Sequence, residues 1–361
     1  TDDERSLHRK TADADCPLRG AGARAYLDID ALIDAAARTG CTAIHPGYGF
    51  LSENAVFASR CRSAGLTFVG PDPETLELLG DKAAARALAR RLEIPVVEGT
   101  NGPTSVDQAI AFFRQLPEGS AMMIKAIAGG GGRGMRAVRT EDEIASAFER
   151  CRSEAKSAFG ADDLYVERLL TSVLHVEVQV LGDGRTAVCV GDRECSLQRR
   201  RQKLIEIAPA PGLDPALRAA LARHSLRLSE RLGYKGLGTF EFLVSTEGDG
   251  DHVFMEANPR LQVEHTVTEA VTGIDLVKAQ IAVALGRTLA DLGLAGGTPA
   301  ADGCAIQLRV NLESIDEQGM TRTGDGPLQA FDLPSGPGIR VDSCGYTGLD
   351  PSAHFDSLIA K

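Results

Sequence analysis

The chain has 361 residues, of which 43% are hydrophobic and 25% are charged. This composition excludes a disordered or fibrous protein and suffices for two or three packed domains. The formal net charge of −11 argues against nucleic acid or an anionic membrane as the main partner. The apolar runs are far shorter than the roughly 20 residues of a membrane-spanning helix, so a cytoplasmic protein is expected. Eight cysteines without a Cys-x-x-Cys pair predict reduced thiols.

The first part of the chain alternates helix and strand patterns. Apolar positions recur at helical spacing over residues 28–39, with Asp28 as the N-cap and Gly40 as the stop. The following elements are predicted as a strand at 41–44, a helix at 54–64, a strand at 66–69 and helices between 73 and 92. Short Gly or Pro joints between them predict an α/β layer with a parallel sheet that ends near Ile94.

The middle of the chain predicts a different architecture. A helix at 105–116 precedes strands at 121–126 and 135–139, which enclose a glycine loop at 129–134 and so form a hairpin. Thr140 and Glu143 have capping-box spacing, which predicts a helix that can extend to Phe159. A strand at 164–170 and antiparallel β structure from Val173 follow, since Val176 and its neighbours alternate with polar residues. Helices are predicted at 215–232 and 268–285.

The last segment predicts a small β-rich unit. Residues 292–302, rich in Gly, Ala and Pro, are typical of a linker, and strands are predicted at 304–312 and 339–342. The expected domains are therefore 1–94, 95–292 with a subdomain at about 105–170, and 293–361. The fold class is α/β, and α+β overall.

The glycine loop at 129–134 allows phosphate oxygens to approach backbone N–H groups, because glycine has no Cβ. It lacks the Gly-Lys-Ser/Thr ending of a P-loop, and it joins two strands where a dinucleotide-binding fingerprint joins a strand to a helix. A hairpin that covers phosphates fits better, and Lys125 directs a cation to the same place. The alternative for Lys125 is an ordinary solvated lysine on a strand.

Glu241 and Glu256 have the most informative spacing in the chain. They lie on predicted strands at 238–244 and 252–257, joined by a turn at 245–251. A hairpin centred midway between them places the carboxylates opposite each other, which destabilises a sheet unless a cation lies between them. Asn258 adds an amide oxygen on the same face, so the set suits a divalent metal with nucleotide phosphates. The alternative is two solvent-facing glutamates in a shifted register.

Residues 260–265 bring a cation, an amide and a potential base together. If the chain stays extended, Arg260, Gln262 and Glu264 lie on one side. Arg260 can then bind a planar anion, and an ionised Glu264 can accept a proton. The alternative is an ordinary surface loop. His265 and Cys195 are expected to be structural, because neither has a histidine partner at a suitable spacing.

Six blocks resemble the biotin carboxylase family of ATP-grasp enzymes, in family order and over nearly the whole chain. They are His45-Pro-Gly-Tyr-Gly-Phe-Leu-Ser-Glu-Asn54, Gly80-Asp-Lys82, Lys125 with residues 129–135, Glu194-Cys-Ser-Leu-Gln-Arg-Arg-Arg-Gln-Lys203, Gly238-Thr-Phe-Glu-Phe242 and Glu256-Ala-Asn-Pro-Arg-Leu-Gln-Val-Glu-His265. The resemblance implies an N-terminal biotin carboxylase α/β domain incomplete at its start, an ATP-grasp domain with a glycine-rich lid, and a C-terminal β-rich domain incomplete at its end.

The resemblance also implies the ligands and the residues that bind them. ATP phosphates would be bound by Lys82, Lys125, Gly130, Gly131 and Gly132. The rest of the nucleotide would lie against Glu167, Arg168, Leu170, Gln198, Arg201 and Leu243. Mg²⁺ or Mn²⁺ would be held by Glu241, Glu256 and Asn258. Bicarbonate would be bound by Lys203, Arg260, Gln262, Val263 and Glu264, with Glu264 as the general base. The biotin side would contain Tyr48 and Arg309, with Arg309 stabilising the ureido enolate.

The implied reaction is attack of bicarbonate on the γ-phosphate of ATP to give carboxyphosphate and ADP, followed by release of CO₂ and carboxylation of biotin N1′. The implied partners are a biotin carrier domain and a carboxyltransferase, on the same polypeptide or on separate subunits of a homo-oligomer or larger complex. The alternatives are an ATP-grasp ligase with another acceptor and a nucleotide-binding scaffold without catalysis. The Gln262 to His265 and Gln202-Lys203 features favour the carboxylase.

Three positions depart from the family pattern. The family commonly has His where Arg201 stands, and His and Glu where Cys304 and Gln307 stand. The Gln307 variant resembles single-chain bacterial acyl-CoA carboxylases of fatty acid metabolism. None of the lysines, at 10, 82, 125, 156, 203, 235, 278 and 361, is flanked by Met, so the biotin is expected on a carrier outside this segment.

Overall fold

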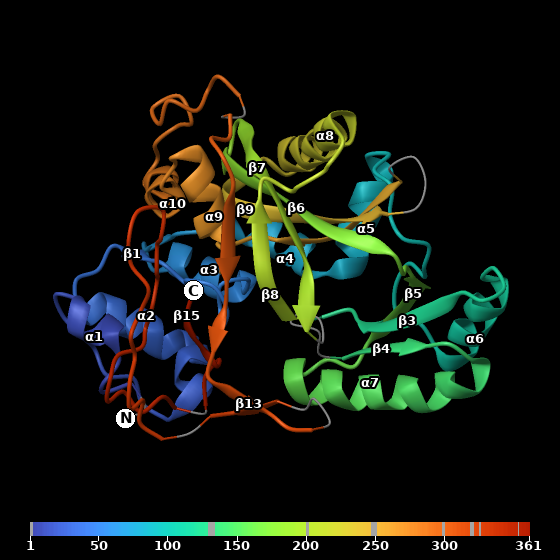
Figure 1. Ribbon diagram of the computed structural model, residues 1–361, viewed down its shortest axis with the longest axis horizontal. Coiled ribbons are helices and arrows are strands. Elements are labelled where there is room, and N and C mark those ends of the chain that lie inside the picture. The colour runs from blue at the N-terminus through green and yellow to red at the C-terminus, as the bar shows by residue number, and fades with distance from the viewer. Residues whose placement is uncertain are drawn as a thin grey trace.

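The structure, a computed structural model, describes residues 3–128, 134–199, 202–246, 251–297, 300–317, 321–324, 326–352 and 354–361. Gly130, Gly131, Gly132 and Arg201, which the sequence assigns to the nucleotide, lie outside the described residues. Figure 1 shows a central sheet, with the N-terminal unit at the lower left and a smaller unit of β3, β4, β5, α6 and α7 at the lower right.

The N-terminal unit contains a parallel strand pair, as predicted. Its elements are α1 (Leu7–Thr11), a 3₁₀ helix (Gly22–Leu27), α2 (Ile29–Arg38), β1 (Ala43–Ile44), α3 (Ala55–Ser63), β2 (Thr67–Phe68), α4 (Pro73–Gly80) and α5 (Lys82–Arg91). The Asp28 side chain accepts a hydrogen bond from the Ala31 amide, which confirms the predicted N-cap. Strands β1 and β2 pair in parallel, so this part of the chain forms the expected α/β layer.

The lid unit is a three-stranded antiparallel sheet with two helices packed on it. Its elements are α6 (Val106–Gln115), β3 (Ala121–Ala126), β4 (Met135–Val138), a 3₁₀ turn (Glu141–Glu143), α7 (Ile144–Phe159) and β5 (Leu164–Leu169), with strand order β4-β3-β5. The predicted hairpin of β3 and β4 is confirmed. The capping box of Thr140 and Glu143 closes the 3₁₀ turn, so α7 begins one turn later than predicted. Met122, Ile124 and Phe148 are fully buried between sheet and helices.

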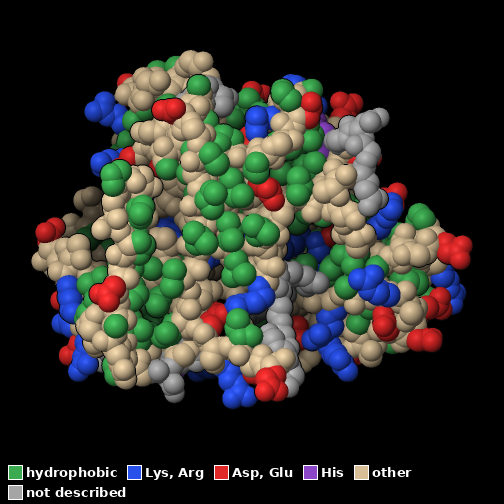
Figure 2. Space-filling model, in the orientation of Figure 1, with side chains coloured by type: hydrophobic (Ala, Val, Ile, Leu, Met, Phe, Trp, Pro, Cys, Tyr) green, Lys and Arg blue, Asp and Glu red, His purple; other side chains and the backbone are tan. Residues whose placement is uncertain are grey.

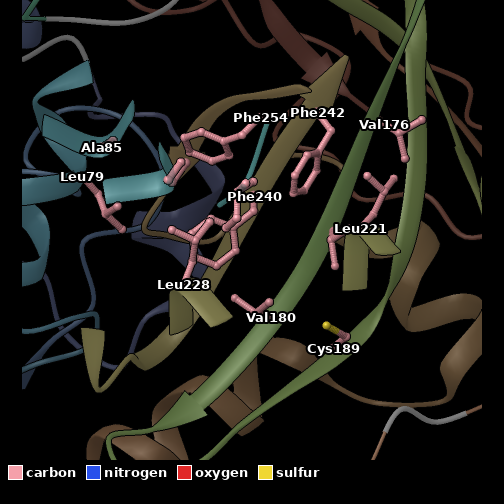
Figure 3. Packing of buried hydrophobic residues seen from close by; sticks show 14 of the residues in the cluster. Leu79, Ala85, Val176, Val180, Cys189, Leu221, Leu228, Phe240, Phe242 and Phe254 are labelled. Atoms are coloured by element: carbon pink, nitrogen blue, oxygen red, sulfur yellow. The ribbon is translucent and has the colours of Figure 1, made fainter. Parts of the chain in front are cut away.

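The central sheet has strand order β10-β9-β6-β7-β8-β11. Its strands are β6 (Val173–Asp183), β7 (Ala187–Arg199), β8 (Gln202–Ala208), β9 (Lys235–Ser245), β10 (His252–Asn258) and β11 (Ala305–Leu308). Helix α8 (Pro215–Leu232) packs on one face, where Phe240, Phe242 and Phe254 contact Leu221 and Leu228 in one core (Figure 3). Helices α9 (His265–Thr272) and α10 (Leu276–Ala284) cover the other face.

The hairpin of β9 and β10 has the predicted register. Glu256 pairs directly with Glu241, and Asn258 with Thr239. The register shifts by one residue between Phe254 and Glu256, closer to the turn. The two carboxylate-bearing residues are therefore direct cross-strand neighbours.

One predicted helix and one predicted strand differ clearly in the structure. The helix predicted at 268–285 is two helices, because Gly273 adopts a left-handed conformation with φ 70° and the Asp275 side chain caps α10. The strand predicted at 339–342 does not form. Asp342 instead exchanges backbone hydrogen bonds with Lys361 in both directions.

The C-terminal unit begins inside the central sheet. Strand β11 forms its edge, and the strand predicted at 304–312 is interrupted at Arg309 before β12 (Val310–Asn311). Strand β12 pairs with β15 (Leu358–Ala360), and β13 (Glu313–Ile315) pairs with β14 (Thr321–Thr323). Figure 2 shows hydrophobic side chains gathered over the orange strand at the centre of Figure 1, where Ile306 and Leu308 are exposed. Among the described helices, none combines the length and the apolar character needed to cross a membrane.

Candidate active site

A cavity of about 730 Å³ lies between the lid unit and the central sheet. Every described residue that the family resemblance assigns to the nucleotide, the metal or bicarbonate lines it: Lys82, Lys125, Glu167, Arg168, Leu170, Gln198, Lys203, Glu241, Leu243, Glu256, Asn258, Arg260, Gln262, Val263 and Glu264. Arg309 also lines the cavity, but Tyr48 does not and is 42% exposed. The Tyr48 phenol nevertheless lies near enough to Arg309 for the two groups to interact electrostatically, and its assignment to the biotin side stays a prediction.

The centre of the cavity floor is the ammonium group of Lys203 on β8. Its Nζ contacts Glu177 Oε2 at 2.5 Å, Glu264 Oε1 at 2.7 Å and Glu241 Oε1 at 3.2 Å. The sheet register explains this convergence, because Glu177 of β6 pairs with Glu241 of β9 on one side and with Arg193 of β7 on the other. Burial disfavours the charge on Lys203, but the three carboxylates outweigh this and raise its pKa well above the usual value.

Sequence patterns missed four members of this cluster: Glu177, Gln179, Arg193 and His175. The alternation in β6 correctly separates polar from apolar residues, but Glu177 and Gln179 are fully buried under the site. Glu177 accepts a hydrogen bond from Arg193 Nε, and Arg193 Nη1 donates to Gln179 and Thr268. His175 Nε2 lies 2.5 Å from Glu241 Oε2. The available signal was the alternation of Glu177 and Gln179 with Val176 and its apolar neighbours. This alternation separates the two faces of the strand, but it does not show which face is exposed to solvent.

Glu264 lies between two cations at the start of α9. Its Oε1 accepts from Lys203, and its Oε2 accepts from Arg309 Nη2 at 3.0 Å. Burial would raise the pKa of Glu264, but the charges of Lys203, Arg309 and Arg193 hold it well below the usual value. The carboxylate is therefore ionised at neutral pH, as a proton acceptor must be.

The residues assigned to the metal supply hard oxygen donors. Asn258 Nδ2 donates to Glu241 Oε1 at 2.6 Å, so the amide lies next to the carboxylate. Glu256 Oε2 is 3.0 Å from Lys82 Nζ on α5. Carboxylate and amide oxygens at adjoining strand positions fit Mg²⁺ or Mn²⁺, and the ammonium groups of Lys82 and Lys203 show that this region stabilises positive charge.

The end of the cavity that contains Lys125 has a second buried ion cluster. Glu167 of β5 forms ion pairs with Lys125 of β3 and with Arg86 of α5, and Arg86 also donates to the Val97 carbonyl at 2.7 Å. Burial raises the pKa of Glu167, but the charges of Lys125 and Arg86 lower it by a larger amount, so the pKa lies below its usual value. Arg86 was not predicted, because its partners are distant in the sequence. Gln198 Nε2 donates to the Cys195 carbonyl at 2.7 Å.

The segment before α9 brings its three predicted side chains to the cavity, but not as an extended strand. Arg260 Nε donates to Glu53 Oε1 at 2.5 Å, and Gln262 Nε2 donates to Glu241 Oε1 at 3.1 Å. The backbone of Glu264 has already turned, with φ −81° and ψ 4°. The surroundings of His265 and Cys195 agree with the structural roles expected for them. His265 is buried with Nδ1 2.7 Å from the Gln262 carbonyl, and burial raises the pKa of the Cys195 thiol well above its usual value.

Comparison with known families covers most of the chain. Residues 1–76 match the family model of the biotin carboxylase N-terminal domain, residues 81–292 that of the carbamoyl-phosphate synthase L chain ATP binding domain, and residues 307–361 that of the biotin carboxylase C-terminal domain. A pyruvate carboxylase of Schizosaccharomyces pombe is 43% identical over 367 residues, covering 100% of this chain and 30% of that protein. The chain thus spans less than a third of the length of this relative.

Solved structures give the same assignment. The biotin carboxylase domain dimer of 2-oxoglutarate carboxylase from Hydrogenobacter thermophilus, in complex with MgADP, ADP and bicarbonate, has a TM-score of 0.93 and 37% identity over 99% of this chain and 78% of that chain. A single-chain, multi-domain long-chain acyl-CoA carboxylase has a TM-score of 0.85 and 46% identity over 100% of this chain and 33% of that chain. The chain belongs to the biotin carboxylase family of ATP-grasp domains, which carries out the ATP-dependent carboxylation of biotin, the first half-reaction of biotin-dependent carboxylases.

Proposed function

We propose that this chain catalyses that half-reaction with Glu264 as the general base, Lys203, Arg260, Gln262 and Val263 as the bicarbonate site, and Arg309 at the biotin enolate. The contact of Glu264 with both Lys203 and Arg309 carries the proposal. The ionised carboxylate of Glu264 lies between the ammonium of Lys203, which suits a small anion, and the guanidinium of Arg309. A base next to two anion sites is what carboxylation through carboxyphosphate requires.

The order of events follows from the charges. Bicarbonate competes with Glu264, Glu241 and Glu177 for the ammonium of Lys203. Once Lys203 donates to bicarbonate, less positive charge acts on Glu264, so its pKa rises and its carboxylate becomes a stronger base. Glu264 can then remove the bicarbonate proton as the oxygen attacks the γ-phosphate. The planar guanidinium of Arg260 can hold the other oxygens.

At the nucleotide end, Lys82 and Lys125 would neutralise phosphate charge, and Glu167, Arg168, Leu170, Gln198 and Leu243 would line the nucleotide. Glu241, Glu256 and Asn258 would hold Mg²⁺ or Mn²⁺, which supplies further charge neutralisation on the phosphates. Lys82 must then exchange Glu256 for a phosphate oxygen. The 3.0 Å ion pair of Lys82 and Glu256 is consistent with such an exchange. Lys82 would gain a phosphate and Glu256 a metal ion, so each group would again have a partner of opposite charge.

The test is ATP cleavage by the purified chain with and without bicarbonate and free biotin. We expect ADP release to require bicarbonate and to be stimulated by biotin, with carboxybiotin as the product. ADP release that ignores bicarbonate but responds to an amino acid or ammonia would overturn the proposal in favour of another ATP-grasp ligase. No ADP release under any condition would favour a scaffold without catalysis.

We further propose an acyl-CoA as the final carboxyl acceptor, with a biotin carrier domain and a carboxyltransferase as partners in a homo-oligomer. The 46% identity to the single-chain long-chain acyl-CoA carboxylase, and Gln307, support the acceptor, and the domain dimer of the Hydrogenobacter enzyme supports self-association. The native protein should carboxylate acyl-CoA thioesters and not pyruvate or 2-oxoglutarate. Carboxylation of pyruvate alone would refute this choice. Light scattering of the chain tests the oligomer.

A further inference from the structure

The guanidinium group of Arg260, which lines the cavity, donates to three acceptors in the described part of the chain. Its Nε donates to Glu53 Oε1 at 2.5 Å, its Nη1 to the Leu261 carbonyl at 3.2 Å and its Nη2 to Asn258 Oδ1 at 3.2 Å. A guanidinium group has five N–H donors, one on Nε and two on each terminal nitrogen. These contacts therefore leave one N–H on Nη1 and one on Nη2 for a ligand.

Glu53 belongs to the sequence block at 45–54 and lies 207 positions before the arginine that it contacts. The backbone on both sides of Glu53 is held by local hydrogen bonds. Before it, the Gly49 amide donates to Ser52 Oγ at 3.0 Å, and the Ser52 amide donates to the Gly49 carbonyl at 2.9 Å. After it, the Asn54 side chain caps α3. The carboxylate is therefore presented from a rigid turn of the N-terminal unit.

Glu53 exerts the strongest attraction of any single charge on Arg260. Burial lowers the pKa of Arg260, but the negative charges of Glu53, Glu264 and Glu241, in decreasing order, raise it above its usual value. Arg260 lines the cavity and Glu53 does not, so Glu53 can affect a bound anion through Arg260. If Glu53 were neutral, the guanidinium would be attracted chiefly by Glu264 and Glu241, which are the proposed base and a proposed metal ligand.

We propose that Glu53 is a positioning residue that holds the Nε edge of Arg260, so that one N–H of each terminal nitrogen stays available for two oxygens of bicarbonate. The inference rests on the proposed function, in which Arg260 binds bicarbonate. Two parallel N–H···O bonds to a planar anion require a fixed orientation of the guanidinium plane. A carboxylate on Nε fixes that plane and leaves the terminal nitrogens free to bind.

The first test compares Glu53→Gln with Glu74→Gln in bicarbonate-dependent ATP cleavage. Glu53→Gln keeps the shape of the side chain and removes its charge, so it should raise the KM for bicarbonate roughly tenfold, the effect of weakening one charge-assisted hydrogen bond. The KM for ATP should change far less. Glu74 of α4 pairs with Arg62 at 2.9 Å and its side chain is 71% exposed, so Glu74→Gln should leave both KM values unchanged. An unchanged KM for bicarbonate in Glu53→Gln, or an equal rise in both KM values, would overturn the inference.

A double-variant cycle followed by urea unfolding gives a readout without turnover. Glu53→Gln should lower the urea midpoint when Arg260 is present, because the mostly buried guanidinium then lacks its carboxylate. In the Arg260→Met background it should not lower the midpoint, since Glu53 has already lost its ion-pair partner and its side chain is 36% exposed. Equal losses in both backgrounds would show that Glu53 does not act through Arg260 and would overturn the inference. If wild type shows no bicarbonate-dependent ATP cleavage, the proposed function fails, while the cycle still decides whether Glu53 holds Arg260.

Discussion

Replacing Lys203 by Met would leave a three-carboxylate cluster without its shared cation. The side chains of Glu177, Glu241 and Glu264 are at most 3% exposed, and that of Lys203 is 12% exposed. Removing one partner of a buried ion pair costs roughly 3–5 kcal/mol, because the other charge stays buried. Each carboxylate keeps one more partner, since Arg193, His175 and Arg309 remain. We therefore expect a loss near 3 kcal/mol at about pH 8.

The sign of the pH dependence distinguishes this electrostatic explanation from a packing effect. In wild type the pKa values of Glu241 and Glu264 are held below the usual range, although burial opposes this, because Lys203 and other cations stabilise the charged forms. Their contribution to stability is present above the unfolded pKa of about 4.3 and is lost as pH falls. Without Lys203, fewer cations oppose the effect of burial, so the pKa values of Glu241 and Glu264 rise. The Lys203→Met variant should then recover stability toward wild type as pH falls to about 5.5.

Urea unfolding followed by circular dichroism at both pH values measures this difference. Lys156→Met is the matched control, because Lys156 Nζ lies 3.7 Å from Asp162 Oδ1 and its side chain is 65% exposed. Such a surface pair contributes about 1 kcal/mol or less. A loss below about 1 kcal/mol for Lys203→Met, or an equal loss at both pH values, would refute the reasoning.

Three further outcomes are expected. Glu264→Gln should reduce bicarbonate-dependent ATP cleavage at least 100-fold, in keeping with the usual worth of a general base, while ATP binding measured by calorimetry stays intact; wild-type turnover would end its assignment as the base. Glu256→Gln should raise the Mg²⁺ concentration needed for half-maximal activity, and an unchanged Mg²⁺ dependence would count against a metal between the facing carboxylates. Peptide mass spectrometry of the native protein should detect no biotin on any lysine between Thr1 and Lys361, and a single biotinylated lysine in that range would refute the prediction of a carrier outside this segment.

Local spacing predicted the parts of the site that depend on local geometry. The pairing of Glu241 with Glu256 follows from the distance of each from one turn, and the shift at Phe254 changes only the pairs nearer that turn. Helix caps such as Asp28 were also predictable, because a cap and its amide lie within three residues. Both the hairpin register and the helix cap depend on residues that are close together in the chain, so a single sequence is enough to predict them.

The buried counter-ions could not be found in this way. Arg86 meets Glu167 across 81 positions, and Arg309 meets Glu206 across 103. Whether a polar residue on an alternating strand faces water or another strand's charge depends on the sheet order, which the sequence does not state. The strand predicted at 339–342 fails for the same reason, because backbone pairing begins only at Asp342, whose partner Lys361 follows β15 and is distant in the sequence.

The cavity is neutralised by its own residues, and this has a consequence for binding. Lys82 is paired with Glu256, Lys125 with Glu167, and Arg260 with Glu53. A phosphate that recruits Lys82 frees Glu256 for a cation, and a cation at Glu256 releases Lys82 toward phosphate. By thermodynamic linkage each ligand must then strengthen the other by the same factor. We therefore expect Mg²⁺ to bind weakly without nucleotide, because it would have to displace the Lys82 ammonium from Glu256 before a phosphate is present to receive it.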